Sequence, residues 1–99
     1  MFYRNKQKTA DYRMYQEQIN DLTDGDWPFD SELVSVDVVA GFSNRGADLD
    51  NVIKPILDTY QLIYDDFNDN KVYKINLEKE IVKKGEEFLD VTFRKIEDD

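Results

Sequence analysis

The chain has 99 residues with neither cysteine nor histidine, and its 22 acidic side chains outnumber its 13 Lys and Arg, for a formal net charge of −9. This length suits one domain with one core. The missing Cys and His exclude disulfides, zinc sites of the Cys/His type and nucleophiles activated by an imidazole. No apolar run approaches the ~20 residues that cross a bilayer, so we expect a cytoplasmic protein with no membrane partner.

The charge is unevenly spread along the chain. Residues 1–13 hold four basic residues and one acid, whereas residues 14–40 hold seven acids and no base. A net negative chain lacks the basic footprint that is typical of nucleic-acid binders, although its first residues carry one. The acidic stretch is explained most simply as a solvated surface that aids solubility.

The first 30 residues predict one helix after a short polar segment. Residues 1–8 are polar and basic with no clear period, so they form either an arm or a short edge strand. Thr9 is a suitable N-cap, and the turn formers at residues 24–28 end the helix. Between them, apolar side chains recur at the three- and four-residue spacing of an amphipathic helix. These are Tyr12, Tyr15, Ile19 and Leu22.

A strand is predicted over residues 32–42. Its apolar residues alternate with Ser35 and Asp37, which is the two-residue period of a strand with one core face and one wetter face. Residues 43–46 form the loop that follows. The core face contains Val34, Val36, Val38, Ala40 and Phe42.

A second helix is predicted to begin near Asp50 or Asn51, either of which can cap its free amides. Pro55 has no N–H, so the helix must either start late or kink at this residue. Apolar residues again follow the helical period, which predicts one buried face. They are Val52, Ile53, Ile56, Leu57, Tyr60, Ile63 and Tyr64.

Two strands are predicted after an acidic loop at residues 65–70. Residues 72–82 and residues 88–96 each alternate apolar and polar side chains, and the turn formers at 83–86 separate them. Two strands joined by such a short turn favour an antiparallel hairpin.

The predicted fold class is therefore α+β. We expect a small mixed β-sheet with two helices packed on one face, in the order α-β-α-β-β after the N-terminal arm or edge strand. A single domain spans residues 1–99, with an acidic tail at 97–99.

Asp48 and Asp50 are the first candidates for chemistry. In an extended segment, carboxylates at this spacing project to the same side about 6.6 Å apart, so both can reach one divalent cation. Lys54 lies one helical turn beyond Asp50, and an aspartate of the 65–70 loop can add a third ligand. A cation such as Mg²⁺ relieves the repulsion among three carboxylates. The same residues also suit a simpler arrangement, in which an aspartate caps the helix, Lys54 pairs with it and the loop acids are solvated.

A longer pattern around these residues resembles the RusA family of Holliday junction resolvases. Residues 47–58 read ADLDNVIKPILD, and residues 68–72 read NDNKV before a strand. The family carries D-x-D-N-x-x-K at a helix start and then an acidic loop before the next strand. The resemblance covers about residues 34–96, since the preceding strand and the final two strands also fall where family members have them.

This resemblance implies a small homodimeric, Mg²⁺-dependent endonuclease that resolves four-way DNA junctions by symmetric nicks in recombination and repair, of a kind common in phages and prophages. Asp48 and Asp50 match the two motif aspartates, and Lys54 matches the motif lysine. Asp69 matches the loop aspartate, with Asp66 as second choice. The four matched residues would be catalytic, and the three aspartates would hold Mg²⁺, or Mn²⁺ in its place.

Neighbouring residues have structural interpretations. Asn51 matches the motif asparagine, which we expect to cap the helix. Asp58 also fits the pattern and lies on the polar side of the helix beyond Lys54, where it either supports the site or is merely solvated. Aromatic side chains near the site could stack on junction bases, but we expect Tyr60 and Tyr64 to pack in the core. Trp27 is expected to anchor its loop over the core.

Candidates for phosphate contact lie in the basic N-terminal segment or beside the acidic cluster, and each also suits a plain solvated surface. The alternative function is that of a non-catalytic acidic binding protein or DNA mimic, which would present residues 14–40 to a basic partner. The candidate DNA-binding residues are Arg4, Lys6, Lys8, Arg13, Asn44, Arg45, Lys71 and Lys74.

Overall fold

The computed structural model describes residues 2–9, 14–15, 17–19, 27–29, 33–46, 50–64 and 67–96, with the backbone alone at positions 2, 50 and 51. The strands are β1 (Phe2–Lys8), β2 (Val34–Phe42), β3 (Val72–Ile81) and β4 (Phe88–Lys95). The helical elements with defined bounds are α2 (Asp50–Ile63) and the short 3₁₀ turn η1 (Asp69–Lys71).

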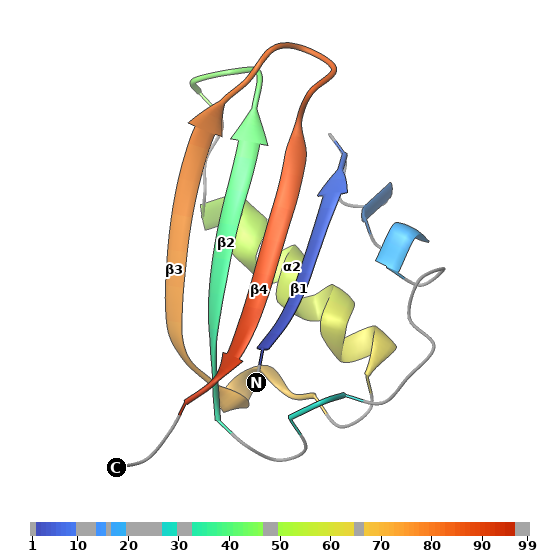
Figure 1. Cartoon of the computed structure of the whole chain (residues 1–99), viewed down its shortest axis with the longest axis vertical. Helices are drawn as coiled ribbons and strands as arrows, with labels where there is room; N and C mark the ends of the chain where they lie inside the picture. Colours follow the sequence, from blue (N-terminus) through green and yellow to red (C-terminus); the bar gives the residue numbers. More distant parts are fainter. Residues whose placement is uncertain are drawn as a thin grey trace.

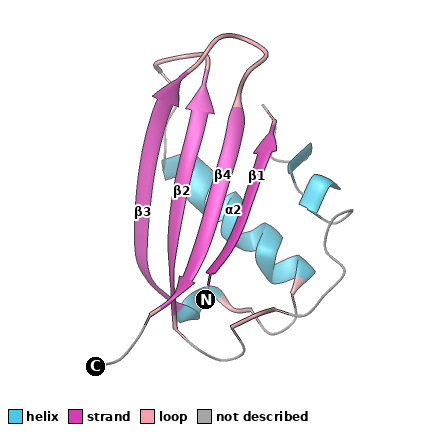
Figure 2. Cartoon of the chain, in the orientation of Figure 1, coloured by secondary structure: helices cyan, strands magenta, loops and turns pink. Residues whose placement is uncertain are grey.

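The four strands form one mixed sheet in the order β1-β4-β2-β3 (Figure 1). β2 is parallel to β3 and antiparallel to β4, and β4 is antiparallel to β1. Helix α2 crosses one face of this sheet (Figure 2). The α+β class and the mixed sheet are confirmed, and residues 2–8 form an edge strand. The predicted acidic tail, 97–99, lies outside the described residues.

The predicted hairpin between the last two strands is wrong. β3 and β4 are not neighbours, because β2 lies between them and pairs with both. β2 buries Val34, Val36 and Val38 almost completely, whereas most of β3 is exposed. Placing the more apolar strand in the centre buries more apolar surface, and α2 provides the long crossover that parallel pairing of β2 with β3 requires.

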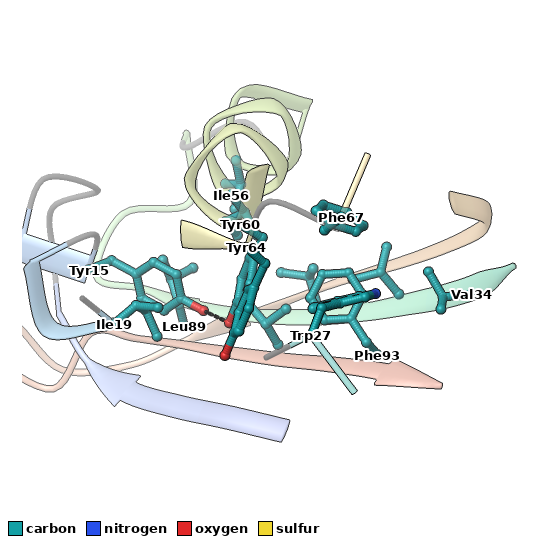
Figure 3. Close-up of a cluster of buried hydrophobic side chains, with 14 of the residues drawn as sticks. Tyr15, Ile19, Trp27, Val34, Ile56, Tyr60, Tyr64, Phe67, Leu89 and Phe93 are labelled. Atoms are coloured by element: carbon teal, nitrogen blue, oxygen red, sulfur yellow. Dashed lines mark hydrogen bonds between the residues drawn. The ribbon is translucent and has the colours of Figure 1, made fainter. Parts of the chain in front are cut away.

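The core lies between the sheet and α2 and is rich in aromatic rings (Figure 3). The helix contributes Val52, Ile56 and Tyr60, all fully buried. Trp27 is 4% exposed, and its ring lies within 5.2 Å of several other aromatic rings, centroid to centroid, so it anchors its loop on the core as expected. Those neighbouring rings belong to Phe29, Tyr64, Phe67 and Phe93.

Two described pieces of the predicted first helix support that prediction. Residues 14–15 and 17–19 are helical, and both Tyr15 and Ile19 are buried in the core. The Tyr15 and Tyr60 hydroxyls are 2.9 Å apart and hydrogen-bond each other (Figure 3). Burial raises the pKa of both tyrosines above their ordinary value, because ionisation away from water is costly. Tyr12 and Leu22 lie outside the described residues.

None of the helical segments that the structure describes has the length and apolar character needed to cross a membrane.

Candidate functional site

The outer side of α2 carries the polar residues of the candidate site. The helix begins at Asp50, and Lys54 follows one turn later with 79% of its side chain exposed. The Lys54 ammonium lies 3.7 Å from the Asp58 carboxylate, one further turn along, so the two form an exposed ion pair. Lys54 therefore points to solvent on the polar side of the helix, as a residue that meets a charged ligand must.

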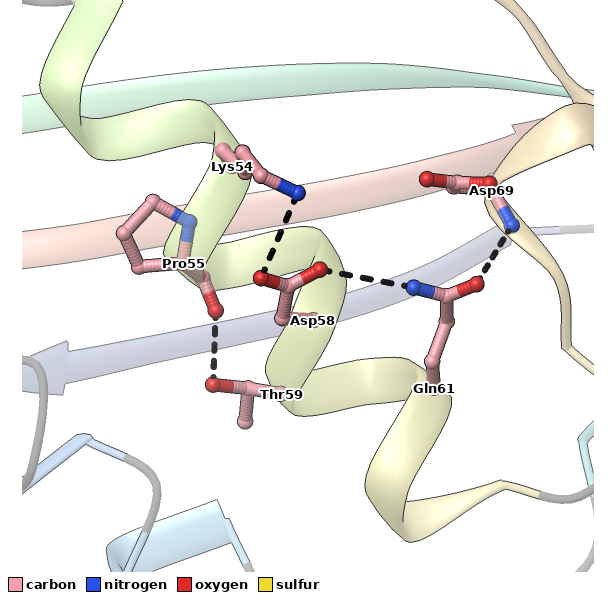
Figure 4. A network of polar contacts seen from close by, with 6 residues as sticks. All are labelled: Lys54, Pro55, Asp58, Thr59, Gln61 and Asp69. Carbon is pink, nitrogen blue, oxygen red and sulfur yellow. Dashed lines mark hydrogen bonds and ion pairs between the residues drawn. The ribbon is translucent and has the colours of Figure 1, made fainter.

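Pro55 lies inside α2 and not in its first turn. Because proline has no N–H, the Asn51 carbonyl loses its donor four residues later in the helix. One turn on, the Thr59 hydroxyl donates to the Pro55 carbonyl over 2.8 Å (Figure 4). Of the two arrangements predicted for Pro55, the late start is wrong, since the helix begins five residues before it.

Gln61 connects α2 to the loop aspartate. Its side-chain carbonyl accepts a hydrogen bond from the Asp69 backbone N–H over 3.1 Å, and its amide nitrogen lies 3.5 Å from the Asp58 carboxylate. Asp69 begins η1, which Asn68 caps by accepting from the Asn70 N–H. A continuous row of polar contacts thus runs from Lys54 to Asp69 (Figure 4). We call these four residues, Lys54, Asp58, Gln61 and Asp69, the α2–η1 row.

The Asp69 side chain is free to meet a ligand. It is exposed, and no side chain in the described part of the chain pairs with its carboxylate. In Figure 4 this carboxylate extends back toward the end of the row that Lys54 occupies. The two separate parts of the sequence motif, the helix and the acidic loop, are therefore joined on one side of the molecule.

The spacing along the helix also limits the site. Gln61 lies eleven residues after Asp50, which is about 16 Å of helix rise. Asp69 bonds to Gln61, so the α2 carboxylate linked to it most directly is Asp58 and not Asp50. Asp58 was expected either to support the site from its neighbourhood or to be merely solvated, and in the structure it contacts both Lys54 and Gln61.

Several candidate residues fall outside what the structure describes. These are Asp48, Asp66 and Arg13, together with the Asp50 side chain. Among the described residues alone, no three acidic side chains gather as a metal centre would need. Of the three predicted metal ligands, Asp69 is the one whose side chain the structure describes.

The basic residues of β1 lie on the other side of the sheet. The Tyr3 ring packs against Tyr60 in the core, so the alternating Arg4, Lys6 and Lys8 face away from α2. There the Arg4 guanidinium makes two hydrogen bonds to Asp90, of 3.0 and 2.8 Å, and the Lys6 ammonium lies 4.7 Å from the centre of the Phe88 ring.

This helix-free face holds further polar contacts. Asp37 on β2 lies 3.5 Å from the Arg94 guanidinium and accepts a 2.6 Å hydrogen bond from Asn76. Phe88 covers Gly41, where a Cβ atom would lie only 2.4 Å from the ring. The structure therefore does not bring the β1 cations together with the α2–η1 row.

The remaining predicted DNA contacts are dispersed. Lys71 lies in η1, two residues from Asp69, and exposed Lys74 pairs in register with Ser35, which places it on the helix-free face. Asn44 accepts a hydrogen bond from the Gly46 N–H, and the Arg45 carbonyl accepts one from Lys79, so this loop is tied down at the far end of β2. Lys71 is the predicted contact that lies closest to the candidate site along the chain.

Sequence reasoning missed Gln61, although its spacing carried a signal. Positions 54, 58 and 61 follow the helical period, so a polar residue at 61 continues the same helix face. The prediction that Tyr60 and Tyr64 belong to the core is confirmed, since both are buried. Phe67 is also 4% exposed and packs on Trp27, so it is not available to stack on a base.

No model of a known protein family matches this chain, and a search of curated proteins finds no relative. The resemblance to the RusA resolvases rests on the residues of the motif itself.

Proposed function

We propose that this protein is a metal-dependent endonuclease that nicks four-way DNA junctions. The observation that carries the proposal is the hydrogen bond from the Asp69 N–H to Gln61, because it ties the acidic loop to the helix that bears Lys54. A helix and a loop that were paired only by sequence resemblance are thereby in contact. The proposed setting is cytoplasmic DNA recombination and repair.

Asp48, Asp50 and Asp69 would hold Mg²⁺, or Mn²⁺ in its place. Their carboxylate oxygens are the hard ligands that these ions prefer, and the Asp69 carboxylate has no competing partner among the described residues. The bound ion would polarise a phosphoryl oxygen and lower the pKa of a water molecule. About 16 Å of helix rise separates Asp50 from Gln61, and the Asp69 carboxylate extends from Gln61 back toward the Lys54 end of the helix, which shortens the span that the ion would bridge.

Lys54 would neutralise charge that develops on the scissile phosphate. Its ammonium is exposed, and its partner Asp58 restrains it within one helical turn. A fixed cation next to a transferring phosphoryl group stabilises the transition state more than the ground state. Lys71, which follows Asp69 by two residues, would add a phosphate contact on the same side.

The central experiment is cleavage of a synthetic four-way junction in Mg²⁺, beside a linear duplex of the same sequence. We expect nicking of the junction alone. Asp48→Asn and Asp50→Asn should each abolish nicking and leave junction binding intact or tighter, since each removes negative charge from the DNA-facing site. Nicking by either variant at the wild-type rate would contradict the metal site.

Three matched variants test which loop aspartate completes the site. Asp69→Asn should be inactive at limiting Mg²⁺, whereas Asp65→Asn and Asp66→Asn should nick nearly normally. The reason is that Asp69 is the loop residue held to α2 by Gln61. An inactive Asp66→Asn beside an active Asp69→Asn would shift the ligand assignment to Asp66.

The alternative of an acidic binding protein predicts no nicking with any metal ion. The structure describes two acids of the 14–40 stretch, Glu17 and Asp37. Asp37 is already paired with Arg94 and Asn76, so it is not a free acidic surface. Glu17 is exposed, and the other acids of the stretch lie outside the described residues. The nuclease is favoured by the set of three aspartates with Lys54, because a binding protein has no need to keep metal ligands at a fixed spacing.

A further inference from the structure

β3 is an outer strand whose second edge carries no partner in the described part of the chain (Figure 1). The Val82 N–H, one residue beyond β3, donates to the Phe42 carbonyl of β2 over 2.8 Å. Because alternate residues of a strand direct their N–H and C=O to the same side, even-numbered residues of β3 face β2. Odd-numbered residues of β3 therefore direct their backbone groups to the outer edge, where Tyr73, Ile75, Leu77 and Ile81 have no backbone partner among the described residues.

The same strand is unusually apolar for an exposed edge. Five large apolar side chains are exposed in the described residues, and three of them lie on β3. Tyr73 is 70% exposed, Ile75 46% and Ile81 49%. Soluble proteins usually protect such edges, because free backbone groups beside apolar side chains invite pairing with another strand.

The sequence of β3 is complementary to itself when two copies run antiparallel about a two-fold axis at Leu77. In that register Leu77 lies opposite Leu77 of the second copy, and residues at equal distances before and after Leu77 lie opposite each other. Lys74 then lies opposite Glu80 twice, and Tyr73 lies opposite Ile81 twice. No like charges face each other directly, and nine residues of each strand are paired.

Other registers are poorer. A two-fold axis at Glu78 places the Glu78 side chains of the two copies opposite each other. An axis at Lys79 does the same with the two Lys79 side chains and also places Glu78 opposite Glu80. An axis at Asn76 pairs Lys74 with Glu78 and Ile75 with Leu77, but it leaves both exposed apolar ends opposite lysines, Tyr73 with Lys79 and Ile81 with Lys71. The Leu77 register places Ile75 opposite Lys79, but it pairs Lys74 with Glu80 and the exposed Tyr73 with the exposed Ile81, so it is the register of these four that joins the two apolar ends.

The other outer strand, β1, has the opposite character. Its sequence, FYRNKQK, contains three bases and no acid, so two copies would bring Arg4, Lys6 and Lys8 against one another. Such a row of like charges is a common means of blocking edge-to-edge association. β3 contains two lysines and two glutamates, so its own charge is zero although the chain carries −9.

We propose that β3 is the homodimer interface of this protein. Two copies pair antiparallel through their β3 edges about a two-fold axis at Leu77, which joins the two sheets into one continuous eight-stranded sheet. A two-fold contact of this kind uses the same surface of both protomers. It supplies the second protomer that symmetric nicking needs, but it stands on β3 alone and does not depend on the nuclease chemistry.

The test exchanges the charges of the opposing pair and measures oligomeric state by sedimentation equilibrium. Wild type should be dimeric. Lys74→Glu places a glutamate opposite Glu80 at both ends of the interface, and Glu80→Lys places a lysine opposite Lys74 at both ends. The repulsion in either variant should raise the dimer dissociation constant about tenfold or more. Both side chains are exposed, so both variants should fold, which circular dichroism checks.

Mixing the two variants gives the sharpest result. A heterodimer of Lys74→Glu with Glu80→Lys restores both opposite-charge pairs, as does the double variant with itself. We expect dimers to return to near the wild-type dissociation constant in both cases. Lys84→Glu, in the exposed turn after β3, makes the same charge change and should leave the dimer unaffected.

Three results would overturn the proposal: a monomeric wild type, a wild-type dimer that neither single variant weakens, or a mixture that stays monomeric. Because the readout is mass and not cleavage, a dimer without nicking would reject the proposed function alone. A monomer that still nicks would reject the β3 interface alone.

Discussion

The two sides of α2 differ in almost every physical respect. Toward the sheet, Ile56 and Tyr60 are fully buried among apolar and aromatic side chains. Toward solvent, Lys54 and Asp58 form an ion pair with side chains 79% and 49% exposed, and Gln61 reaches to Asp69. Burial of apolar area stabilises a fold far more than an exposed ion pair does. The inner side of α2 therefore determines stability, and the outer side can change with little effect on folding.

The largest contrast is expected between Ile56→Ala and Lys54→Ala. Truncating the buried isoleucine leaves a cavity and should lower the free energy of unfolding by about 2–5 kcal/mol. Lys54→Ala removes one exposed ion pair and should change the free energy of unfolding by less than ~0.5 kcal/mol. Urea unfolding followed by circular dichroism measures both. Equal losses in the two variants would mean that the outer side contributes to stability as the inner side does.

The second effect should be visible in activity only. Lys54→Ala should slow junction nicking about 100-fold, equivalent to ~2.7 kcal/mol of transition-state stabilisation. Lys54→Arg keeps the charge but has a planar donor group, so we expect partial recovery. Single-turnover nicking at saturating Mg²⁺ is the measurement. A wild-type rate for Lys54→Ala would leave the lysine as a plain helix-surface residue.

The third effect belongs to the buried tyrosines. Burial raises the pKa of Tyr15, Tyr60 and Tyr64 in the folded state, whereas an unfolded tyrosine titrates near pH 10. Below about pH 10 both states are protonated and stability is complete. Above it the unfolded state loses protons first, so stability should fall by up to ~1.4 kcal/mol per pH unit for each tyrosine.

Tyr15→Phe should make this alkaline loss less steep. It should also cost about 1 kcal/mol at neutral pH, because the buried hydrogen bond between the Tyr15 and Tyr60 hydroxyls is lost. Unfolding measured from pH 8 to 11 gives both values, with Leu62→Ala, a change at an exposed and uncharged residue of α2, as a control whose alkaline slope should match wild type. An unchanged slope in Tyr15→Phe would show that Tyr15 does not contribute to it.

The sequence was a good guide to elements and a poor guide to strand order. Alternation in β2 and the helical period of α2 are local signals, and the buried residues follow them closely. The hairpin prediction failed because the short turn at 83–86 suggested that β3 and β4 were neighbours. Strand order depends instead on which strand buries most apolar surface, and that comparison favours β2 in the centre.

The candidate site was predictable in part for the same reason. Lys54 and Asp58 are spaced one helical turn apart, so the sequence itself places them on a common face of the helix. The contact between Gln61 and Asp69 joins residues eight apart across the end of a helix, where no simple period applies. The opposite placement of Arg4 and Lys6 likewise follows from the pairing of β1 with β4, a contact between the two ends of the chain.

The smallest expected effect tests whether Gln61 positions Asp69. Gln61→Ala removes the acceptor of the Asp69 N–H and leaves the Asp69 carboxylate in place. We expect the Mg²⁺ concentration for half-maximal nicking to rise about three- to tenfold, or roughly 0.7–1.4 kcal/mol, because the ligand must be ordered when the ion binds. The rate at saturating Mg²⁺ should change little, and the unfolding midpoint should match wild type. Leu62→Ala, the neighbouring residue on α2 and 70% exposed, is the matched control and should alter none of these values. A fall in the saturating rate without a change in the Mg²⁺ requirement would assign Gln61 to the reaction itself and not to the placement of Asp69.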